Sequence, residues 1–284
     1  GTLTIQGGTE GTGVLDATGN TSGAGIGSGK DNSCANITIS GGKIIATGGY
    51  DSAGIGTGCD VSYYGITASN IEISGGIVIA TGNATSAGIG GGGSGHCAFV
   101  TISGGTVTAT GGVGIGGAKG TYFFPGGNTS DIVISGGSLK TSSIGCAPTN
   151  GTNNVYLFTL ANPDSKTVYI DGVEYLPVNH TAIDSTDTNL YVYLTGEEHT
   201  VRVGDEENIY TYNSNTGAFE VKQGSAFIIT ANDGSSLVHG TDYTYPITTG
   251  VLTILSEKAV TISNAEPTAA TTDRIEVATG ISAN

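Results

Sequence analysis

Residues 36–58 read Asn36-Ile-Thr-Ile-Ser-Gly-Gly-Lys-Ile-Ile-Ala-Thr-Gly-Gly-Tyr-Asp-Ser-Ala-Gly-Ile-Gly-Thr-Gly58, and variants of this stretch recur along the first half of the chain. It contains three short strand-like pieces, ITISGG, KIIATGG and SAGIGTG, each punctuated by glycines. Apolar pieces separated by glycines and repeated at a regular spacing are typical of a chain that winds around one apolar axis. We therefore interpret the stretch as one turn of a coil.

The Gly-Gly pair that ends the first piece sets the repeat length. It returns at Gly7-Gly8, Gly41-Gly42, Gly75-Gly76, Gly104-Gly105 and Gly136-Gly137. This spacing of about 30 residues lies in the range of solenoid repeats. Apolar residues alternate with other residues in the first piece, as in Ile37 and Ile39, and an alternation of two indicates a strand with one face inward.

Aligning the repeats predicts ladders of like side chains. The second piece stacks Ala17, Ala46, Ala80 and Ala109, and the third stacks Ile26, Ile55, Ile89, Ile115 and Ile144. Such ladders fit parallel sheets, whose neighbouring strands lie about 4.8 Å apart. The sequence thus predicts an all-β fold, with a parallel β-helix of about five coils and three strands per coil over residues 1–153.

The second half of the chain follows another pattern. Residues 154–223 lose the Gly-Gly pair and contain longer strand candidates, and they are predicted to form a small antiparallel β domain with a hairpin turn at Asp171-Gly172. Residues 224–263 are predicted to add further strands or a cap. Residues 264–284 resemble the lead-in to another β-helix repeat, so we expect the natural chain to continue past Asn284.

Composition narrows the choice of partners. The chain has 24 acidic and 9 basic residues and a formal net charge of -15, which disfavours nucleic acid and anionic membranes. No apolar run approaches the roughly 18 residues of a membrane span, so membrane insertion is not expected.

The four cysteines, Cys34, Cys59, Cys97 and Cys146, lack the spacing of a zinc or redox site, and both one disulfide and buried free thiols stay open.

Two carboxylates are predicted to stack. Asp31 lies five residues after Ile26, and Asp60 lies five residues after Ile55, so the two aspartates should occupy the same place in successive coils. A bound Ca²⁺ would relieve their repulsion, since this ion accepts six to eight oxygen ligands. A solvated pair without metal is the simpler interpretation. A glycosidase or lyase could also use two such carboxyl groups as acid and base.

Insertions concentrate at one corner of the coil. They cover residues 30–35, 59–69, 93–99 and 118–131, between the third strand of one coil and the first strand of the next, and such an edge often carries the function of a solenoid. Flat aromatic side chains can stack against sugar rings. The candidate aromatic residues at this corner are Tyr63, Tyr64, Phe99, Tyr122, Phe123 and Phe124, with His96 nearby, and Tyr63, Tyr64, Tyr122, Phe123 and Phe124 are the predicted sugar-binding residues. Packing of these rings on the solenoid itself is the alternative.

The succession ITISGG, ATGG, SAGIGGG resembles the right-handed parallel β-helix repeats of large secreted or surface-attached proteins of anaerobic Firmicutes, which are often described as carbohydrate-binding or adhesin-like. The resemblance implies a right-handed coil, an extracellular location on a bacterial cell surface, and contact with a polysaccharide or a host or plant glycan. It transfers no catalytic residue to this chain.

We therefore expect a non-catalytic extracellular module that binds glycans or projects other domains. A β-helix also supports enzymes and passive stalks. A polysaccharide-degrading glycoside hydrolase or lyase is the first alternative. A structural stalk or filament subunit, which associates with neighbouring repeats or with itself, is the second.

Overall fold

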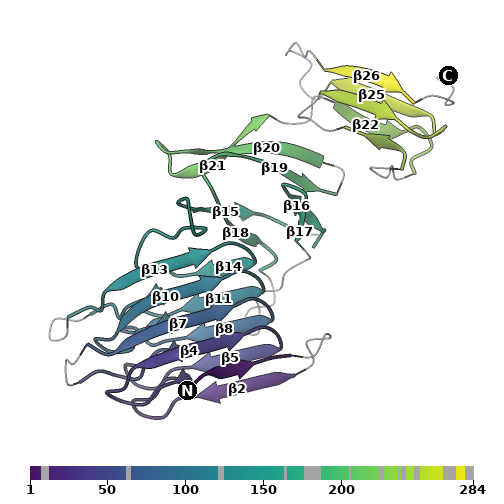
Figure 1. The fold of residues 1–284 in the computed structure, drawn as a ribbon. Helices are drawn as coiled ribbons and strands as arrows, with labels where there is room; N and C mark the ends of the chain where they lie inside the picture. Colours follow the sequence, from purple (N-terminus) through teal and green to yellow (C-terminus); the bar gives the residue numbers. More distant parts are fainter. Residues whose placement is uncertain are drawn as a thin grey trace. The chain divides into compact units, whose positions relative to one another are not determined.

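Figure 1 shows the fold in a computed structural model, which describes residues 1–7, 13–61, 65–120, 125–162, 165–175, 187–204, 206–223, 227–235, 237, 241–245, 250–264 and 273–278. These residues form strands, turns and bends, and none of them lies in a helix. The chain divides into two compact units. The first combines Gly1–Asp164 with Val178–Thr195, and the second combines Ser165–Pro177 with Gly196–Asn284.

Sheet A is the first of three parallel sheets in the first unit. Its described strands follow the order β1 (Leu3–Ile5), β4 (Cys34–Ile39), β7 (Thr67–Ile73), β10 (His96–Ile102) and β13 (Thr129–Ile134). Ile37 pairs with Ile71 and Ile39 pairs with Ile73. All four isoleucines are at most 1% exposed, so the alternation in the sequence does mark a buried face.

Sheets B and C complete each coil, and Figure 1 shows the coils stacked from purple to teal. Sheet B contains β2 (Val14–Thr18), β5 (Lys43–Thr47), β8 (Ile77–Thr81), β11 (Thr106–Thr110) and β14 (Ser138–Thr141). Sheet C contains β3 (Ile26–Gly27), β6 (Ile55–Gly56), β9 (Ala87–Gly90) and β12 (Val113–Gly116), and Ile144 forms a parallel bridge with Ile115. The predicted parallel β-helix with three strands per coil is confirmed.

The core is a column of stacked aliphatic side chains. Ala46 pairs with Ala80 in sheet B, and Ile55 pairs with Ile89 in sheet C. These four side chains are 0% exposed. Because each coil places a side chain of the same size at the same level, the narrow interior is filled at close packing. The predicted alanine and isoleucine ladders are therefore confirmed as core.

The two ends of the column differ. Beyond the last coil, β15 (Tyr156–Leu160) pairs antiparallel with β18 (Leu190–Leu194), and Val155 and Tyr193 pack against the column. Burial raises the pKa of Tyr193 to about 12. In the first coil, by contrast, Leu3 is 43% exposed and Val14 is 64% exposed. The strands β15 and β18 thus cover the end of the solenoid that follows its last coil.

The longer sheet A strands begin earlier in the sequence than predicted, and each contains one residue in the left-handed backbone conformation near its start. These residues are Asn36, Asn70, Phe99 and Asp131, with φ between 51° and 59°, and the pairing register passes over each of them. The strands consequently begin at residues 34, 67, 96 and 129, inside the segments predicted as insertions. The left-handed residue interrupts the alternation of buried and exposed side chains. The sequence pattern therefore indicates only the part of each strand that follows this residue.

The second unit contains a five-stranded sheet among its described residues. Its strands are ordered β17 (Val173–Tyr175), β16 (Val168–Ile170), β19 (Glu198–Val203), β20 (Glu206–Asn213) and β21 (Ala218–Gln223), all antiparallel. The hairpin turn at Asp171-Gly172 is confirmed, with φ of 51° and 79°, as a type I′ turn requires. The segment 154–223 therefore supplies β15 and β18 to the first unit and these five strands to the second.

Two smaller sheets complete the described part of the second unit. One pairs β22 (Phe227–Ala231) with β25 (Val260–Asn264). The other contains β23 (Tyr243–Thr244), β24 (Val251–Ile254) and β26 (Arg274–Val277), with β26 parallel to β24. The described part of the predicted lead-in, 264–284, thus adds a strand to this sheet.

Candidate functional site

The inserted corner consists of the loops that lead from sheet C of one coil to sheet A of the next, residues 28–33, 57–66, 91–95 and 117–128. Asp31 lies in the first of these loops. Its backbone N–H donates to the Cys59 carbonyl (2.9 Å), and its Oδ1 accepts from the Val61 N–H (2.9 Å). The Asp31 carboxylate therefore fastens the next loop at residue 61.

Asp60 occupies the matching place in the second loop, as predicted, but its side chain is fully buried. Its Oδ2 accepts from the Gly65 N–H (3.0 Å) and the Ile66 N–H (3.3 Å). The carboxylate thus holds the chain where the loop returns toward β7. Together the two aspartates fix both described ends of the segment that contains Tyr63 and Tyr64, which lie outside the described residues.

His96 connects this loop to the fourth one. Its backbone N–H donates to the Ile66 carbonyl (2.8 Å), and its ring Nδ1 accepts from the Asn128 N–H (2.7 Å). The Gly65 backbone passes close to the same ring, since a Cβ at Gly65 would lie 3.2 Å from Nε2. His96 therefore bonds to the described ends of two loops, to one through its backbone N–H and to the other through its ring.

The fourth loop carries the other predicted sugar-binding residues, Tyr122, Phe123 and Phe124, which also lie outside the described residues. Its described part is tied together by the Gly127 N–H, which donates to the Ala118 carbonyl (2.9 Å). The Ala118 N–H in turn donates to the Gly95 carbonyl (2.9 Å) of the preceding loop. The loops of the inserted corner are thus joined from coil to coil by hydrogen bonds.

The carboxylates of the corner have structural partners. Asp60 is 0% exposed and accepts backbone amides, so a polysaccharide at the surface does not reach its carboxyl group. This burial disfavours the pair as the acid and base of a hydrolase.

No group of three or more histidine, cysteine or acidic residues within metal-binding distance occurs in the described part of the chain. Calcium binding at Asp31 and Asp60 stays a prediction.

The four cysteines are free thiols in this structure. Burial, with a smaller effect of nearby Cys146, raises the pKa of Cys97 to about 12. Burial also raises the pKa of the Cys34 and Cys59 thiols. A thiol with a raised pKa is a poor nucleophile at neutral pH, because the thiolate is the reactive form. These three cysteines are therefore core residues.

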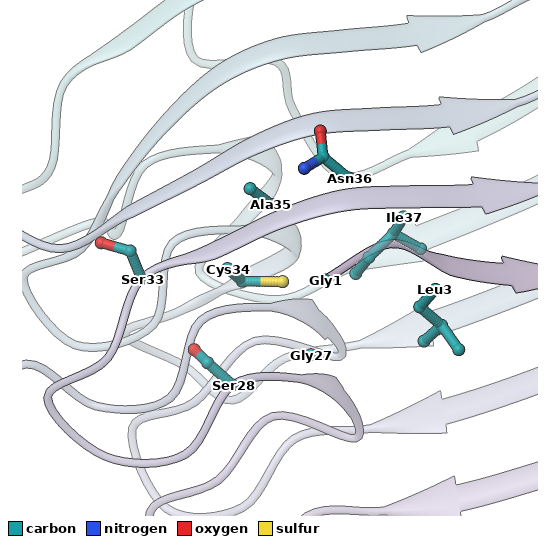
Figure 2. Close-up of a pocket in the computed structure, with 9 residues that line it drawn as sticks. All are labelled: Gly1, Leu3, Gly27, Ser28, Ser33, Cys34, Ala35, Asn36 and Ile37. Carbon is teal, nitrogen blue, oxygen red and sulfur yellow. The ribbon is translucent and has the colours of Figure 1, made fainter.

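Figure 2 shows a pocket in the first unit, beside the first coil. It is lined by Gly1, Leu3, Gly27, Ser28, Ser33, Cys34, Ala35, Asn36 and Ile37. Most of these side chains are small or apolar, and none of them is a carboxylate, an imidazole or an amine. The side chains of this lining therefore offer hydrogen bonds and apolar contact.

Comparisons with known proteins agree with the stacked coils. A protein-family model described as Beta helix repeat matches residues 37–59, 71–93 and 100–119. No curated protein and no solved structure matches the chain. The chain therefore contains a parallel β-helix repeat region. Within the described residues, no helix has the length and apolar character needed to span a membrane.

Proposed function

We propose that the chain is a non-catalytic extracellular module of a bacterial surface protein and binds glycans at the inserted corner, in the manner of an adhesin. The observation that carries the proposal is the fastening of the two loops that contain the candidate aromatic residues. Asp60 holds one of these loops, and His96 contacts both. Loop ends that are already ordered lower the entropy that is lost when the loops bind a ligand.

The charge of the chain supports a neutral glycan as the partner. With a formal net charge of -15, the module repels polyanions at low salt. The location on a bacterial surface is supported by the resemblance of the repeats to surface-attached proteins. Calcium at Asp31 and Asp60 would add a further constraint on the loop between residues 61 and 65.

A glycan array tests the proposal. The purified chain is applied with calcium and with a chelator, next to a Tyr63→Ala/Tyr64→Ala/Tyr122→Ala variant. We expect saturable binding that this variant loses. Tyr50→Ala is the control, because Tyr50 is 71% exposed and lies outside the inserted corner. A blank array, or binding that survives the triple change, contradicts the proposed site. Binding that is unaffected by the chelator contradicts the calcium prediction alone.

A structural stalk or filament subunit is the second candidate function. It is favoured by the first coil, where Leu3, Val14 and Leu15 are 43%, 64% and 38% exposed and where β1, β2 and β3 lie at the edges of their sheets. Unpaired strand edges with exposed apolar side chains favour association. Sedimentation at increasing protein concentration tests this candidate. Larger species that Leu15→Asp abolishes support it, and a monomer at all concentrations contradicts it.

Turnover of a polysaccharide would identify the enzymatic alternative. Asp31 and Asp60 are poorly suited to act as the acid and base of this reaction, since Asp60 is buried. Reducing sugar released by the wild-type chain, and lost in Asp31→Asn, would overturn the non-catalytic proposal.

A further inference from the structure

The left-handed residues of sheet A form a column on its outer face. Ala98 of β10 pairs with Ser69 of β7 and with Ser130 of β13. The next residues along the three strands are Asn70, Phe99 and Asp131, which therefore lie at the same level in successive coils. Asn36 continues the column in β4. Neighbouring strands of a sheet lie about 4.8 Å apart, so these side chains are close neighbours.

Phe99 is the unusual member of this left-handed column. Asparagine and aspartate adopt a positive φ more readily than other residues, whereas a bulky side chain there is an outlier. Phe99 nevertheless has a φ of 55°, and its side chain is 55% exposed. Neither backbone preference nor burial of the ring accounts for phenylalanine at this position. Strained residues of this kind are concentrated at functional sites.

The surroundings of Phe99 combine a flat apolar surface with polar groups. The residues that precede the column on the outer face are small, namely Ser69, Ala98 and Ser130. Asn70 lies one coil before Phe99, and its Nδ2 donates to Asn36 Oδ1 (3.1 Å), which orients the Asn70 amide along the column. The exposed carboxylate of Asp131 lies one coil after Phe99. An aromatic surface between hydrogen-bonding groups suits a ligand with an apolar face and polar edges.

We infer that Phe99, Asn70 and Asp131 form a subsite for one ring of an uncharged polysaccharide. The C–H face of a pyranose stacks on the Phe99 ring, and its hydroxyl groups bond to the Asn70 amide and the Asp131 carboxylate. A uronic acid is rejected, because Asp131 and the exposed Glu72 of the same sheet face add to the negative charge of the chain. This inference rests on the proposed function and places a contact on sheet A, next to the inserted corner.

The decisive variant is Phe99→Asn, because asparagine is the residue that the column has in β4 and β7. Binding of neutral cello-, xylo- and manno-oligosaccharides is measured by calorimetry, with oligogalacturonate as the anionic comparison. We expect Phe99→Asn to weaken binding of the neutral sugars roughly tenfold or more. The same change should leave the thermal midpoint equal to or above that of the wild type, because it removes the backbone strain. Phe99→Tyr keeps the ring and should keep binding.

Tyr50→Asn is the matched control, since it removes an aromatic side chain that is 71% exposed outside the column. If the wild type binds neutral sugars and Phe99→Asn binds equally well, the subsite is refuted while the proposed function stands. If Phe99→Asn loses binding and the triple tyrosine variant retains it, the subsite is supported and the inserted corner is refuted. If the wild type binds none of these sugars, or binds oligogalacturonate more tightly, the subsite is overturned.

Discussion

The Asp60 carboxylate accepts hydrogen bonds from two backbone amides in a place that solvent does not reach. Asp31 has the same position one coil earlier, but it is partly exposed and accepts the Val61 N–H at the surface. A buried donor that loses its acceptor costs about 1–3 kcal/mol, whereas water replaces a lost partner at the surface. The two aspartates should therefore differ strongly in their effect on stability.

We predict that Asp60→Ala lowers the free energy of unfolding by about 2–4 kcal/mol, because the Gly65 and Ile66 amides lose their acceptor. Asp31→Gly is the control. Glycine accepts the φ of 58° at this position without strain, so we expect a change within about 0.5 kcal/mol. Urea unfolding followed by circular dichroism measures both values. Equal effects of the two changes would show that Asp60 does not anchor the loop.

The strands of sheet C approach those of sheet B so closely that side chains are excluded at some positions. A Cβ at Gly88 in β9 would lie 2.6 Å from the Thr110 N and 2.9 Å from the Ala80 O. Contacts under 3.0 Å with backbone atoms cannot be relieved by turning a side chain. Glycine at this position is therefore required by the width of the coil.

We predict that Gly88→Ala destabilises the first unit by about 1–3 kcal/mol or more through overpacking. Gly29→Ala is the matched control, because a Cβ at Gly29 meets no atom within 4 Å. The control should change the stability by no more than about 0.5 kcal/mol. Thermal unfolding of the two variants and of the wild type measures these changes in stability. A Gly88→Ala variant as stable as the wild type would contradict the close approach of the sheets.

The strand β18 is attached to the last coil through an ionic network. Lys140 Nζ in β14 donates to Asp187 Oδ2 (2.5 Å), and the Tyr191 hydroxyl donates to the same oxygen (3.0 Å). Burial of Asp187 acts to raise its pKa, but the hydrogen bonds from Lys140, Asn189 and Tyr191 outweigh it and hold the pKa below its usual 3.8. The charged form of Asp187 therefore stabilises the attachment of β18 to β14.

This network predicts a pH dependence. An acid whose pKa is lower in the folded state stabilises the fold above the unfolded pKa, and the contribution is lost as the pH falls through the folded pKa. We expect Asp187→Asn to unfold at a lower temperature than the wild type at pH 7. The difference should begin to shrink as the pH falls below about 5 and should be smallest below the folded-state pKa of Asp187. Melting curves over this range measure it, and a constant difference would contradict the ionic network.

At the scale of the whole molecule, the solenoid depends on β15 and β18 to cover its last coil. Val155 and Tyr193 pack against the core, and the main chain of Tyr191 donates to Ser138 Oγ (3.1 Å) in β14. Residues 1–153 contain the coils but neither of these strands. A solenoid without a terminal cap exposes apolar core and is prone to aggregation.

We predict that a fragment of residues 1–195, which spans all of the first unit, unfolds cooperatively and stays monomeric at low concentration. A fragment of residues 1–153 should aggregate or unfold at a clearly lower temperature. Light scattering and thermal unfolding of the two fragments test the prediction. Equal behaviour would show that β15 and β18 are dispensable.

The repeats are visible in the sequence because each coil meets the same environment. The ladders led by Ile37, Ala46 and Ile55 follow from glycine spacing and from the alternation of two, since every coil must fill the same narrow interior. The turn at Asp171-Gly172 was predictable for a local reason, because two adjacent residues must adopt a positive φ. Composition and repeat pattern thus determined the architecture of the first half.

The position and environment of individual side chains were decided by tertiary contacts. Asp31 and Asp60 have the same spacing in the sequence, yet only Asp60 is buried, because the longer loop after it brings the Gly65 and Ile66 amides back onto the carboxylate. The partner of the last coil, β18, lies far from β14 in the sequence and is selected by packing. The sequence alone determined the β-helix, since its period is local and repeated. Loop anchoring, the cap and the exposure of Phe99 depend on contacts between coils, which only the folded chain brings together.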